Sequence, residues 1–470
     1  MIWLVMILLL FIFQAATILI SEYRRPAKSV AWLSILFIFP IIGFVMYYFI
    51  AREYVRRKKV HRGQRVAGVW PKGQEQLAGS KESDHWLPDN PRLRDWLRHV
   101  PEAPITEHNQ VEVLTNADVT YEAMLQEIGR ATDHIHFEFY TIRDDAIGKR
   151  FQEALIRKAK EGVAVRVIYD GMGSHTLTKS YIRSLQKAGI AVYPFLKPLI
   201  AFFDQRINYR NHRKIVVVDG LVGFVGGINI GAEYVGGNPK LGFWRDTHVR
   251  LHGDAVYELQ NTFLTDWYFV SGESIEASRY YPVHTVQQVS SVQVIASGPD
   301  ARWDAIQEMY FAALIAAKQR IWITTPYFIP DPSIIMALKS AAISGIDVRV
   351  ILPYVADSRI VQYASKSFLY ELLQAGVRFY WYQKGFIHAK IILVDEIMAT
   401  VGTANVDMRS FFSNFELNAV MFDLNVMKRL EADFQMDLKD STEVMLSEFE
   451  KRSRGEQRKE RIARLLSPLF

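Results

Sequence analysis

Two copies of one eight-residue pattern, HxKxxxxD, limit the possible folds of this chain more than any other feature. The six residues that define the copies are His212, Lys214, Asp219, His388, Lys390 and Asp395. Corresponding residues are 176 positions apart in each case (388 − 212, 390 − 214 and 395 − 219). Both copies continue into small residues that end in asparagine, GGIN at 226–229 and GTAN at 402–405. A duplication kept in register predicts two similar units that contribute to one site with two histidines.

The sequence around the motifs repeats as well. HIHFEFYTIRDD at 134–145 corresponds to RIWITTPYFIPD at 320–331, and GVAVRVIYDG at 162–171 corresponds to GIDVRVILPY at 345–354. These strand-like apolar runs alternate with helical patterns such as YEAMLQEIGRATD and EMYFAALIAAKQ. We therefore expect an α/β fold with two similar lobes, at 106–285 and 286–445, each built on a mostly buried sheet.

Composition narrows the classes of partner and chemistry. The 470 residues are 50% hydrophobic and carry a net charge of +6, with Lys and Arg clustered at 52–65 and 451–464. Basic clusters next to apolar segments favour an anionic membrane surface over nucleic acid as the partner. The chain has no cysteine, which excludes disulfides, thiol catalysis and Cys-ligated zinc. No dense cluster of carboxylates or of Cys and His suggests a metal, so we expect neither a metal nor a cofactor.

The amino end predicts a membrane anchor. Residues 1–20 and 30–50 contain no charged residue, and each is long enough to cross a bilayer as a helix. A secretory signal is the alternative for the first stretch, but its start lacks positive charge and a second apolar stretch follows closely. We expect a two-helix transmembrane hairpin within 1–50, in which Pro40 kinks the second helix.

The segments that flank the lobes are basic. A linker is expected at 51–105, and its stretch REYVRRKKVHRGQR places the large catalytic part in the cytoplasm by the positive-inside rule. Arg24, Arg25 and Lys28 in the short connector favour the opposite orientation but are fewer. The basic tail at 446–470 is interpreted as an amphipathic helix on the membrane or a solvated terminal helix.

The spacing within each motif indicates phosphate chemistry. In a strand, side chains at i and i+2 point the same way, so each histidine lies beside a lysine. Two such pairs that converge would surround a phosphate with two lysines and two histidines, and phosphoryl transfer depends mainly on positioning and charge neutralisation. One histidine can attack phosphorus while the other protonates the leaving alcohol, which gives a covalent phosphohistidine.

Several neighbouring residues are candidates for supporting roles. Gly226, Gly227, Gly402 and Thr403 would let the backbone approach the phosphate, although such glycines alone more often mark tight turns. Asn229 and Asn405 offer amide donors, and Asp246 and Glu416 are candidates to orient the histidines, with a plain salt bridge as the alternative. Asp219 and Asp395 are expected to hold loop backbone. The first lobe also carries an apolar insertion, KPLIAFFDQRINYRN at 197–211, as a substrate wall, a lid or an ordinary loop.

The segments NHRKIVVVDGLVGFVGGINI and FIHAKIILVDEIMATVGTANVDMRSF resemble the phospholipase D superfamily, whose members carry two such motifs. With WRDTHVRLHGDAVYELQNTFLTDW, TPYFIPD, NFELN and RLLSPLF, the chain is similar to the bacterial cardiolipin synthase family over essentially its whole length. The resemblance implies two α/β/α sandwich lobes in a pseudo-twofold unit, with both His-Lys pairs in one site at their interface. It implies transfer of a phosphatidyl group between two phosphatidylglycerol molecules, which gives cardiolipin and glycerol, and we assign the attack to His212.

Three other readings share part of this pattern. A phosphodiesterase or nuclease of the phospholipase D type would use water as the acceptor, and another phosphatidyltransferase would use a different alcohol, such as serine. A catalytically silent membrane scaffold would be expected to have lost a motif histidine or lysine, and none is lost. The sequence gives no oligomeric state.

Overall fold

The computed structural model describes residues 2–21, 26–47, 90–100, 102–196, 209–275, 278–286, 290–301 and 303–467. Most of the expected basic linker at 51–105 lies outside these residues, as do positions 197–208 of the apolar insertion. Within the linker range, the described part contains one helix, α4 (Pro91–His99), whose N-cap residue Asn90 accepts a hydrogen bond from the Leu93 amide.

The first lobe is a seven-stranded sheet with the order β2-β10-β8-β7-β3-β4-β5. Its strands are β2 (Asn109–Thr115), β3 (His134–Phe139), β4 (Ala164–Asp170), β5 (Ala191–Phe195), β7 (Lys214–Val218), β8 (Val222–Gly226) and β10 (Thr247–Gly253). Strands β3, β4 and β5 run parallel, and β7 is antiparallel to β3. Helices α5 (Ala117–Arg130), α6 (Ala146–Lys160) and α7 (Lys179–Lys187) complete the lobe. Both β3 and β7 are buried along their whole length; β7 is apolar after Lys214, whereas β3 alternates His134, His136 and Glu138 with apolar residues.

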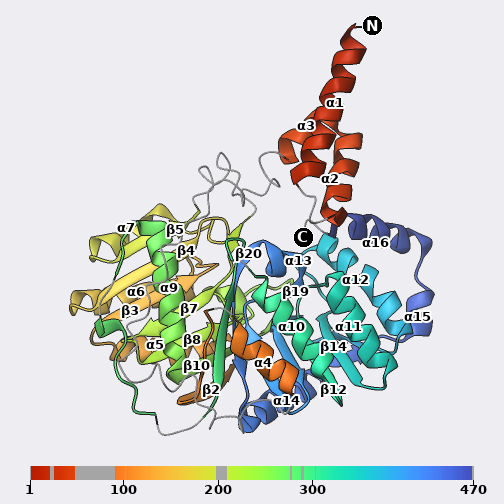
Figure 1. Cartoon of the computed structure of the whole chain (residues 1–470). Helices are drawn as coiled ribbons and strands as arrows, with labels where there is room; N and C mark the ends of the chain where they lie inside the picture. Colours follow the sequence, from red (N-terminus) through yellow and green to blue (C-terminus); the bar gives the residue numbers. More distant parts are fainter. Residues whose placement is uncertain are drawn as a thin grey trace.

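The second lobe repeats this arrangement strand for strand. Its sheet contains the order β11-β20-β18-β17-β12-β14-β15, with β1 (Ile105–Thr106) and β21 (Ser441–Glu443) added at the two edges. The repeated strands are β11 (Val292–Ser297), β12 (Arg320–Thr324), β14 (Asp347–Pro353), β15 (Arg378–Tyr382), β17 (Ile391–Val394), β18 (Met398–Gly402) and β20 (Asn414–Met421). Helices α10 (Ala305–Ala316), α11 (Pro332–Ile343) and α12 (Arg359–Gln374) pack on it (Figure 1). The expected pair of similar α/β lobes is confirmed.

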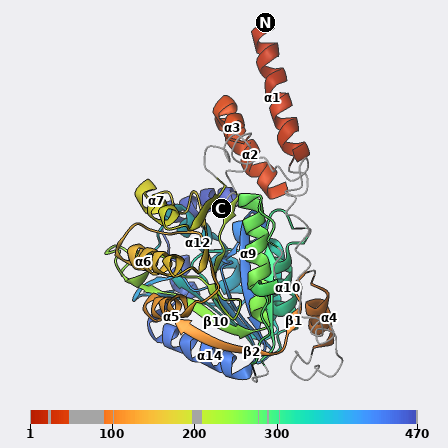
Figure 2. The ribbon, with the colours of Figure 1, turned by 90° about the vertical axis from the view of Figure 1, so that its left-hand side faces the viewer.

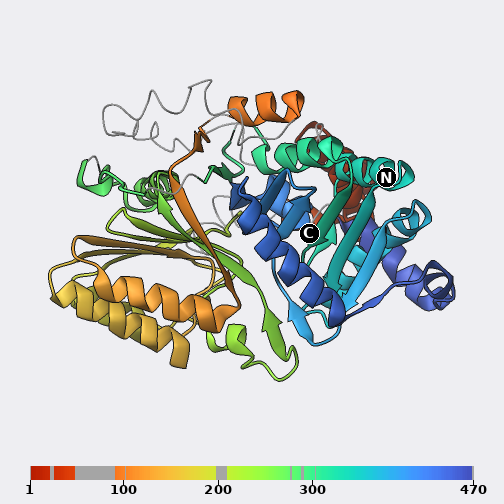
Figure 3. The same ribbon diagram turned by 90° about the horizontal axis from the view of Figure 1, so that it is seen from below.

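The lobes are joined through one apolar core and two short ladders. Side chains from both sheets, among them Ile215 and Val217 of β7 and Ile391 and Leu393 of β17, form a single buried cluster. Helix α9 (Ala255–Ser271) packs against β10 of the first lobe and β11 of the second. Helix α14 (Leu424–Lys439) packs against β2 of the first lobe and β18 of the second, and runs between the lobes in Figure 3. Strand β6 (Arg210–Asn211) of the first lobe pairs with β20 of the second, and β9 (Phe243–Arg245) pairs with β16 (Gly385–Ile387).

Three helices at the amino end stand out from the two-lobe body (Figures 1 and 2). They are α1 (Ile2–Ser21), α2 (Pro26–Ile38) and α3 (Pro40–Met46). The second expected span is therefore two helices instead of one. The chain leaves the helical conformation at Phe39 (φ −131°, ψ 74°), and Pro40 begins α3, where its missing N–H costs no hydrogen bond. Within the described residues, no helix reaches the length and hydropathy needed to cross a membrane, so the transmembrane hairpin is not supported.

The carboxyl-terminal tail contains helix α16 (Arg454–Leu466), which begins at a capping box formed by Ser453 and Glu456. This helix packs against α12 of the second lobe. Its Arg464 donates a hydrogen bond to the Ser367 carbonyl at 2.8 Å and pairs with Glu371 at 2.6 Å. One face of α16 is therefore covered by the protein. Ile462 and Leu465 are exposed, and contact of the tail with a membrane stays a prediction.

Candidate active site

His212 lies just after β6, in the first copy of the motif, and is held by the second lobe. Its backbone N–H donates to the Phe415 carbonyl at 2.9 Å, continuing the ladder between β6 and β20. Its Nδ1 lies 2.9 Å and 3.1 Å from the two carboxylate oxygens of Glu416, which is fully buried in β20. The ladder fixes the backbone, and the carboxylate fixes the ring so that Nε2 is left for chemistry.

His388 repeats the arrangement with the lobes exchanged. Its backbone N–H donates to the Arg245 carbonyl at 2.7 Å, and its Nδ1 lies 2.7 Å from Oδ2 of Asp246. Asp246 follows β9, the strand of the first lobe that pairs with β16. Each motif histidine is therefore oriented by an acid from the opposite lobe, and the site exists only where the two lobes meet.

Both acids are held by further hydrogen bonds. Glu416 accepts from Thr403 Oγ1 at 2.5 Å and from Asn414 Nδ2 at 3.1 Å, while Asp246 accepts from the Thr247 amide at 2.7 Å. Burial alone would raise the pKa of Glu416, but the adjacent His212 and Lys214 hold the pKa below its ordinary value. The same balance of burial against His388 and Lys390 lowers the pKa of Asp246. Both groups are carboxylates at neutral pH.

The motif lysines bring positive charge to the same place. Lys214 Nζ donates to the His212 carbonyl at 2.7 Å, and Lys390 Nζ donates to the His388 carbonyl at 2.5 Å. Burial lowers the pKa of Lys214 to about 7 and the pKa of Lys390 to about 8, and the Lys390 charge contributes to the lowering at Lys214. The two buried ammonium groups repel each other, and a bound phosphate anion would offset that repulsion.

The histidines respond to both lysines. Burial lowers the pKa of His212 to about 4 and the pKa of His388 to about 3. The charge of Lys390 adds to the lowering at His212, and the charge of Lys214 adds to the lowering at His388. Because each lysine acts on the histidine of the other motif, the four side chains form one site. Both imidazoles are neutral near pH 7 without substrate, so His212 or His388 can serve as a nucleophile or a base.

Asp219 and Asp395 lie away from these groups and hold backbone. Asp219 accepts from the amides of 132, 133 and 134 at 2.8 to 2.9 Å, and Asp395 accepts from the amides of 318, 319 and 320 at 2.7 to 2.9 Å. Both residues have positive φ, at 53° and 49°, where the chain turns between the two strands of the motif hairpin. This is the structural role expected for the last residue of each motif.

The small residues after the motifs serve the acids more directly than a phosphate. A Cβ atom on Gly227 would lie 2.1 Å from Oδ1 of Asp246, and one on Gly402 would lie 2.1 Å from Oδ1 of Asn418. One on Gly226 would meet His248 at 2.6 Å. Thr403, at the position equivalent to Gly227, donates to Glu416. Buried side chains therefore occupy the space beside these three glycines, and the approach of the small residues' backbone to the phosphate stays a prediction.

The two asparagines also contact protein groups. Oδ1 of Asn229 accepts from the Thr141 amide at 3.1 Å, and Nδ2 of Asn405 donates to Asp407 at 3.0 Å. The first bond ties the end of GGIN to the segment after β3, whereas the second is local to residues 405–407. Asp407 engages one of the two hydrogens of the Asn405 amide. The roles of Asn229 and Asn405 as donors to phosphate stay predictions.

Two residues of the site have no counterpart in the sequence reasoning. The ring of Tyr140 lies at the end of β3, 5.0 Å from the His212 ring and 5.5 Å from Lys214 Nζ. Arg213, between His212 and Lys214, is fully buried, pairs with Asp266 at 2.5 Å and donates to the carbonyl of Glu416 at 3.1 Å. Tyr140 follows the carboxyl end of a parallel strand, and this position could have indicated that it belongs to the site. Arg213 occupies a variable position of the motif, so the sequence gives no signal for it.

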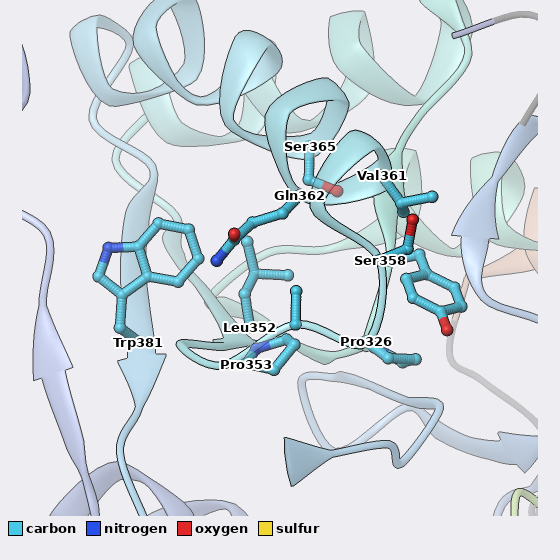
Figure 4. A pocket seen from close by; sticks show the side chains of 10 residues that line it. Pro326, Leu352, Pro353, Ser358, Val361, Gln362, Ser365 and Trp381 are labelled. Atoms are coloured by element: carbon cyan, nitrogen blue, oxygen red, sulfur yellow. The ribbon is translucent and has the colours of Figure 1, made fainter. Parts of the chain in front are cut away.

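A pocket lies at the carboxyl ends of β12, β14 and β15 in the second lobe (Figure 4). Its walls are mostly apolar, and Trp381 of β15 faces Gln362 of α12 across it. The lining residues are Pro326, Tyr327, Leu352, Pro353, Ala356, Ser358, Val361, Gln362, Ser365 and Trp381. Within the described ranges, no group of three or more His, Cys, Asp or Glu side chains has the arrangement of a metal site.

Comparisons with known proteins agree with this geometry. A sequence profile described as "Cardiolipin synthase, PLD-like domain" matches residues 124–267 and 310–438, one segment in each lobe. The chain is 44% identical over 464 residues to "Cardiolipin synthase 2" of Bacillus cereus, covering 97% of this chain and 90% of that protein. It is 40% identical over 468 residues to the major cardiolipin synthase of Bacillus subtilis, covering 98% and 97% of the two chains.

The fold is also found in a solved structure. The crystal structure of phosphatidylserine synthase from Haemophilus influenzae superposes with a TM-score of 0.61, covering 77% of this chain and 95% of that one, at 12% sequence identity. At that identity the likeness concerns the fold alone.

Proposed function

The chain belongs to the bacterial cardiolipin synthases of the phospholipase D superfamily, and we propose that it joins two phosphatidylglycerol molecules through a phosphohistidine intermediate. The observation that carries the mechanism is the pair of crossed contacts, His212 with Glu416 and His388 with Asp246. They aim two neutral imidazoles and two lysines from separate lobes at one point. A single displacement would need one base, whereas two oriented histidines suit two successive displacements.

In the first displacement, Nε2 of His212 attacks the phosphorus of the donor while Glu416 stabilises the positive charge that develops on the ring. The bond between phosphorus and the glycerol headgroup oxygen breaks. His388, which takes up a proton when the phosphodiester anion offsets the charges of the two lysines, supplies that proton to the oxygen. Asp246, 2.7 Å from Nδ1, favours the imidazolium form of His388 that this step needs. Lys214 and Lys390 balance the charge on the non-bridging oxygens.

In the second displacement, a hydroxyl of the acceptor's glycerol headgroup attacks the phosphorus held on His212. His388 now removes the hydroxyl proton, the bond between phosphorus and nitrogen breaks, and cardiolipin is the product. The sum is two phosphatidylglycerol molecules in, and one cardiolipin and one glycerol out. Protons return to their starting atoms, so each turnover leaves the site as it began.

The test is to incubate the detergent-solubilised protein with phosphatidylglycerol in the presence of a chelator and identify the products by mass spectrometry. We expect cardiolipin and glycerol from the wild type and no turnover from His212→Ala or His388→Ala, because a two-histidine relay fails as a unit. Phosphatidic acid as the main product, or activity in either variant, would refute the proposal.

We further propose that α1, α2 and α3 hold the enzyme at a phospholipid bilayer. Large apolar side chains are exposed along these helices, including Trp3, Leu8, Phe37 and Ile41, each more than half exposed. An apolar surface of this extent supports membrane contact. Placement of the two lobes in the cytoplasm remains a prediction from the basic residues at 52–65. In a flotation assay, the full chain should stay bound to phosphatidylglycerol vesicles. Loss of vesicle binding in the double variant Leu8→Glu with Ile41→Glu would support this contact surface, and unchanged binding would refute it.

A further inference from the structure

The two halves of the site differ in charge at two matched pairs of positions. Arg210 lies two residues before His212, and its counterpart two residues before His388 is Phe386 (386 − 210 = 176). Phe386 packs on Trp244 with ring centres 4.9 Å apart. Arg409 follows the GTAN segment, and its counterpart after GGIN is Glu233 (409 − 233 = 176). Two arginines on one side of the site thus have no equivalent on the other, and the repeated fold does not require them.

The fold brings these two arginines together. Arg210 is paired with Asn414 in the ladder between β6 and β20. Arg409 lies in α13 (Met408–Phe412), immediately before β20, and its carbonyl accepts from the amide of Ser413, the neighbour of Asn414, at 2.9 Å. Both side chains are only partly buried. The position equivalent to Arg409 differs in kind, since Glu233 is neutralised by Arg143 at 3.0 Å.

Tyr140 connects the arginine pair to the catalytic groups. The Tyr140 ring lies 5.0 Å from the His212 ring, and the amide of Asn211, next to Arg210, donates to Asp170 at 2.9 Å. Burial and Asp170 raise the pKa of Tyr140, while the charges of Arg210 and Arg409 oppose that rise. Burial and the Arg210 charge lower the pKa of Arg409, as expected for two cations held side by side.

The rim around Tyr140 also borders the second motif. Tyr140 lies near Tyr327, and Tyr327 donates a hydrogen bond to Asp357. The charge of Asp357 in turn acts on Lys390. A ligand on this rim is therefore within reach of both motifs.

Two carboxylates, Asp170 and Asp407, act electrostatically on the arginine pair and also hold backbone. Asp170 accepts from the amides of 172, 173 and 211 at 2.8 to 2.9 Å. Asp407 accepts from the Ser410 amide at 2.7 Å and from Asn405 Nδ2 at 3.0 Å. At the positions that match Tyr140 and Asp170 in the repeat, the second lobe has Pro326 and Pro353, which line its apolar pocket. At these matched positions, polar and cationic side chains therefore lie on only one of the two sides of the site.

We propose that Arg210 and Arg409, with the hydroxyl of Tyr140, bind the phosphate of the acceptor phosphatidylglycerol. The reaction joins two molecules that each carry one phosphodiester, but the two motif lysines surround only the phosphorus that is transferred. The acceptor phosphate is separated from the attacking hydroxyl by the three carbons of glycerol, which suits a second anion site one aromatic ring from His212. Guanidinium groups bind phosphate oxygens in pairs and remain charged at any working pH. This assignment rests on the proposed transfer mechanism and adds no covalent step to it.

The experiment compares two acceptors in the same detergent-solubilised full chain. Cardiolipin formation uses an acceptor with a phosphate, whereas incorporation of labelled glycerol into phosphatidylglycerol uses an acceptor without one and reverses the first displacement. We expect Arg210→Gln and Arg409→Gln to lower cardiolipin formation by roughly 10- to 100-fold, the effect of losing a charge-assisted hydrogen bond, with glycerol exchange within about threefold of the wild type. Arg150→Gln, at an exposed ion pair with Glu122, is the matched control and should change neither rate.

The outcomes separate this proposal from the mechanism beneath it. The mechanism and the acceptor site are both supported if His212→Ala loses both reactions while the arginine variants lose only cardiolipin formation. Glycerol exchange that survives in His212→Ala refutes the mechanism. Equal loss of the two reactions in the arginine variants, or unchanged cardiolipin formation, overturns the acceptor site. Arg210→Lys and Arg409→Lys, which keep the charge, should recover part of the lost rate and guard against misfolding. Stimulation or inhibition of wild-type glycerol exchange by inorganic phosphate, absent in the variants, would assign the pair to free phosphate and also overturn the acceptor role.

Discussion

Replacing Glu416 by Gln tests the contact that joins the lobes at the reacting atoms. The amide keeps the shape of the side chain but removes the negative charge that faces Nδ1 of His212 at 2.9 Å. A hydrogen bond to a charged group contributes about 1.5–3 kcal/mol. With about 1.36 kcal/mol for each tenfold change in rate, kcat should fall roughly 10- to 160-fold. Thr403 can rotate its hydroxyl to suit the amide, so the fold should persist.

The assay is the initial rate of cardiolipin formation in detergent micelles, with thermal unfolding measured on the same samples. Glu443→Gln is the control, because Glu443 lies at the exposed edge strand β21 and pairs with Arg378. It should leave the rate within about twofold, since exposed ion pairs contribute little. Asp246→Asn should resemble Glu416→Gln. A loss below about threefold in Glu416→Gln, in a protein that melts like the wild type, would refute the role given to the crossed acids.

Three further outcomes are expected. Asp395→Ala removes an acceptor of three backbone amides and should lower the free energy of unfolding by about 2–4 kcal/mol in denaturant titration; a large loss of kcat without loss of stability would contradict its structural role. Arg213→Met leaves Asp266 buried without its partner and should cost about 3–5 kcal/mol of stability, which Arg213→Met with Asp266→Leu should largely restore; equal instability of single and double variants would argue against the ion pair. Because Lys214 and Lys390 are protonated only below their pKa values of about 7 and 8, kcat/KM should fall as pH rises through this range, and a profile flat to pH 9 would contradict the account.

The duplicated motif allowed the main features of the fold to be predicted from sequence. Its register of 176 residues, together with the repeated strand patterns, predicts two lobes with the same strand order, and the structure has them. Apolar runs such as KIVVV, with no polar alternation, are typical of strands buried on both faces. The end of each motif was also predictable, because Asp219 and Asp395 stand where a buried strand turns into a hairpin.

The crossing of the acids between lobes could not be read from the sequence. Asp246 and Glu416 each follow the motif of their own lobe, and distance along the chain suggests a partner in the same lobe. The short ladders of β6 with β20 and of β9 with β16 decide otherwise, and strands of two or three residues leave no periodic signal. The packing of Asp246 against Gly227 was hidden for a related reason, since only the folded chain shows that Asp246 fills the space beside this glycine.

The amino end shows a different limit. Hydropathy predicts two spans, and Pro40 predicts a kink in the second; in the structure the chain leaves the helical conformation at Phe39, and Pro40 begins a separate helix. Arg210 and Arg409 were missed because each is unremarkable alone. Their meaning comes from the comparison with Phe386 and Glu233 and from their closeness in space.

The stereochemistry of the transfer tests the central claim most directly. Phosphatidylglycerol of one configuration at phosphorus, with sulfur at one non-bridging oxygen, would be converted to cardiolipin and its phosphorus centres resolved by phosphorus NMR. Attack by a histidine followed by attack by the acceptor inverts the centre twice, so we predict retention of configuration. A product in which the transferred phosphorus is inverted would mean that the acceptor displaces glycerol in a single step, and it would contradict the two-histidine, phosphohistidine mechanism.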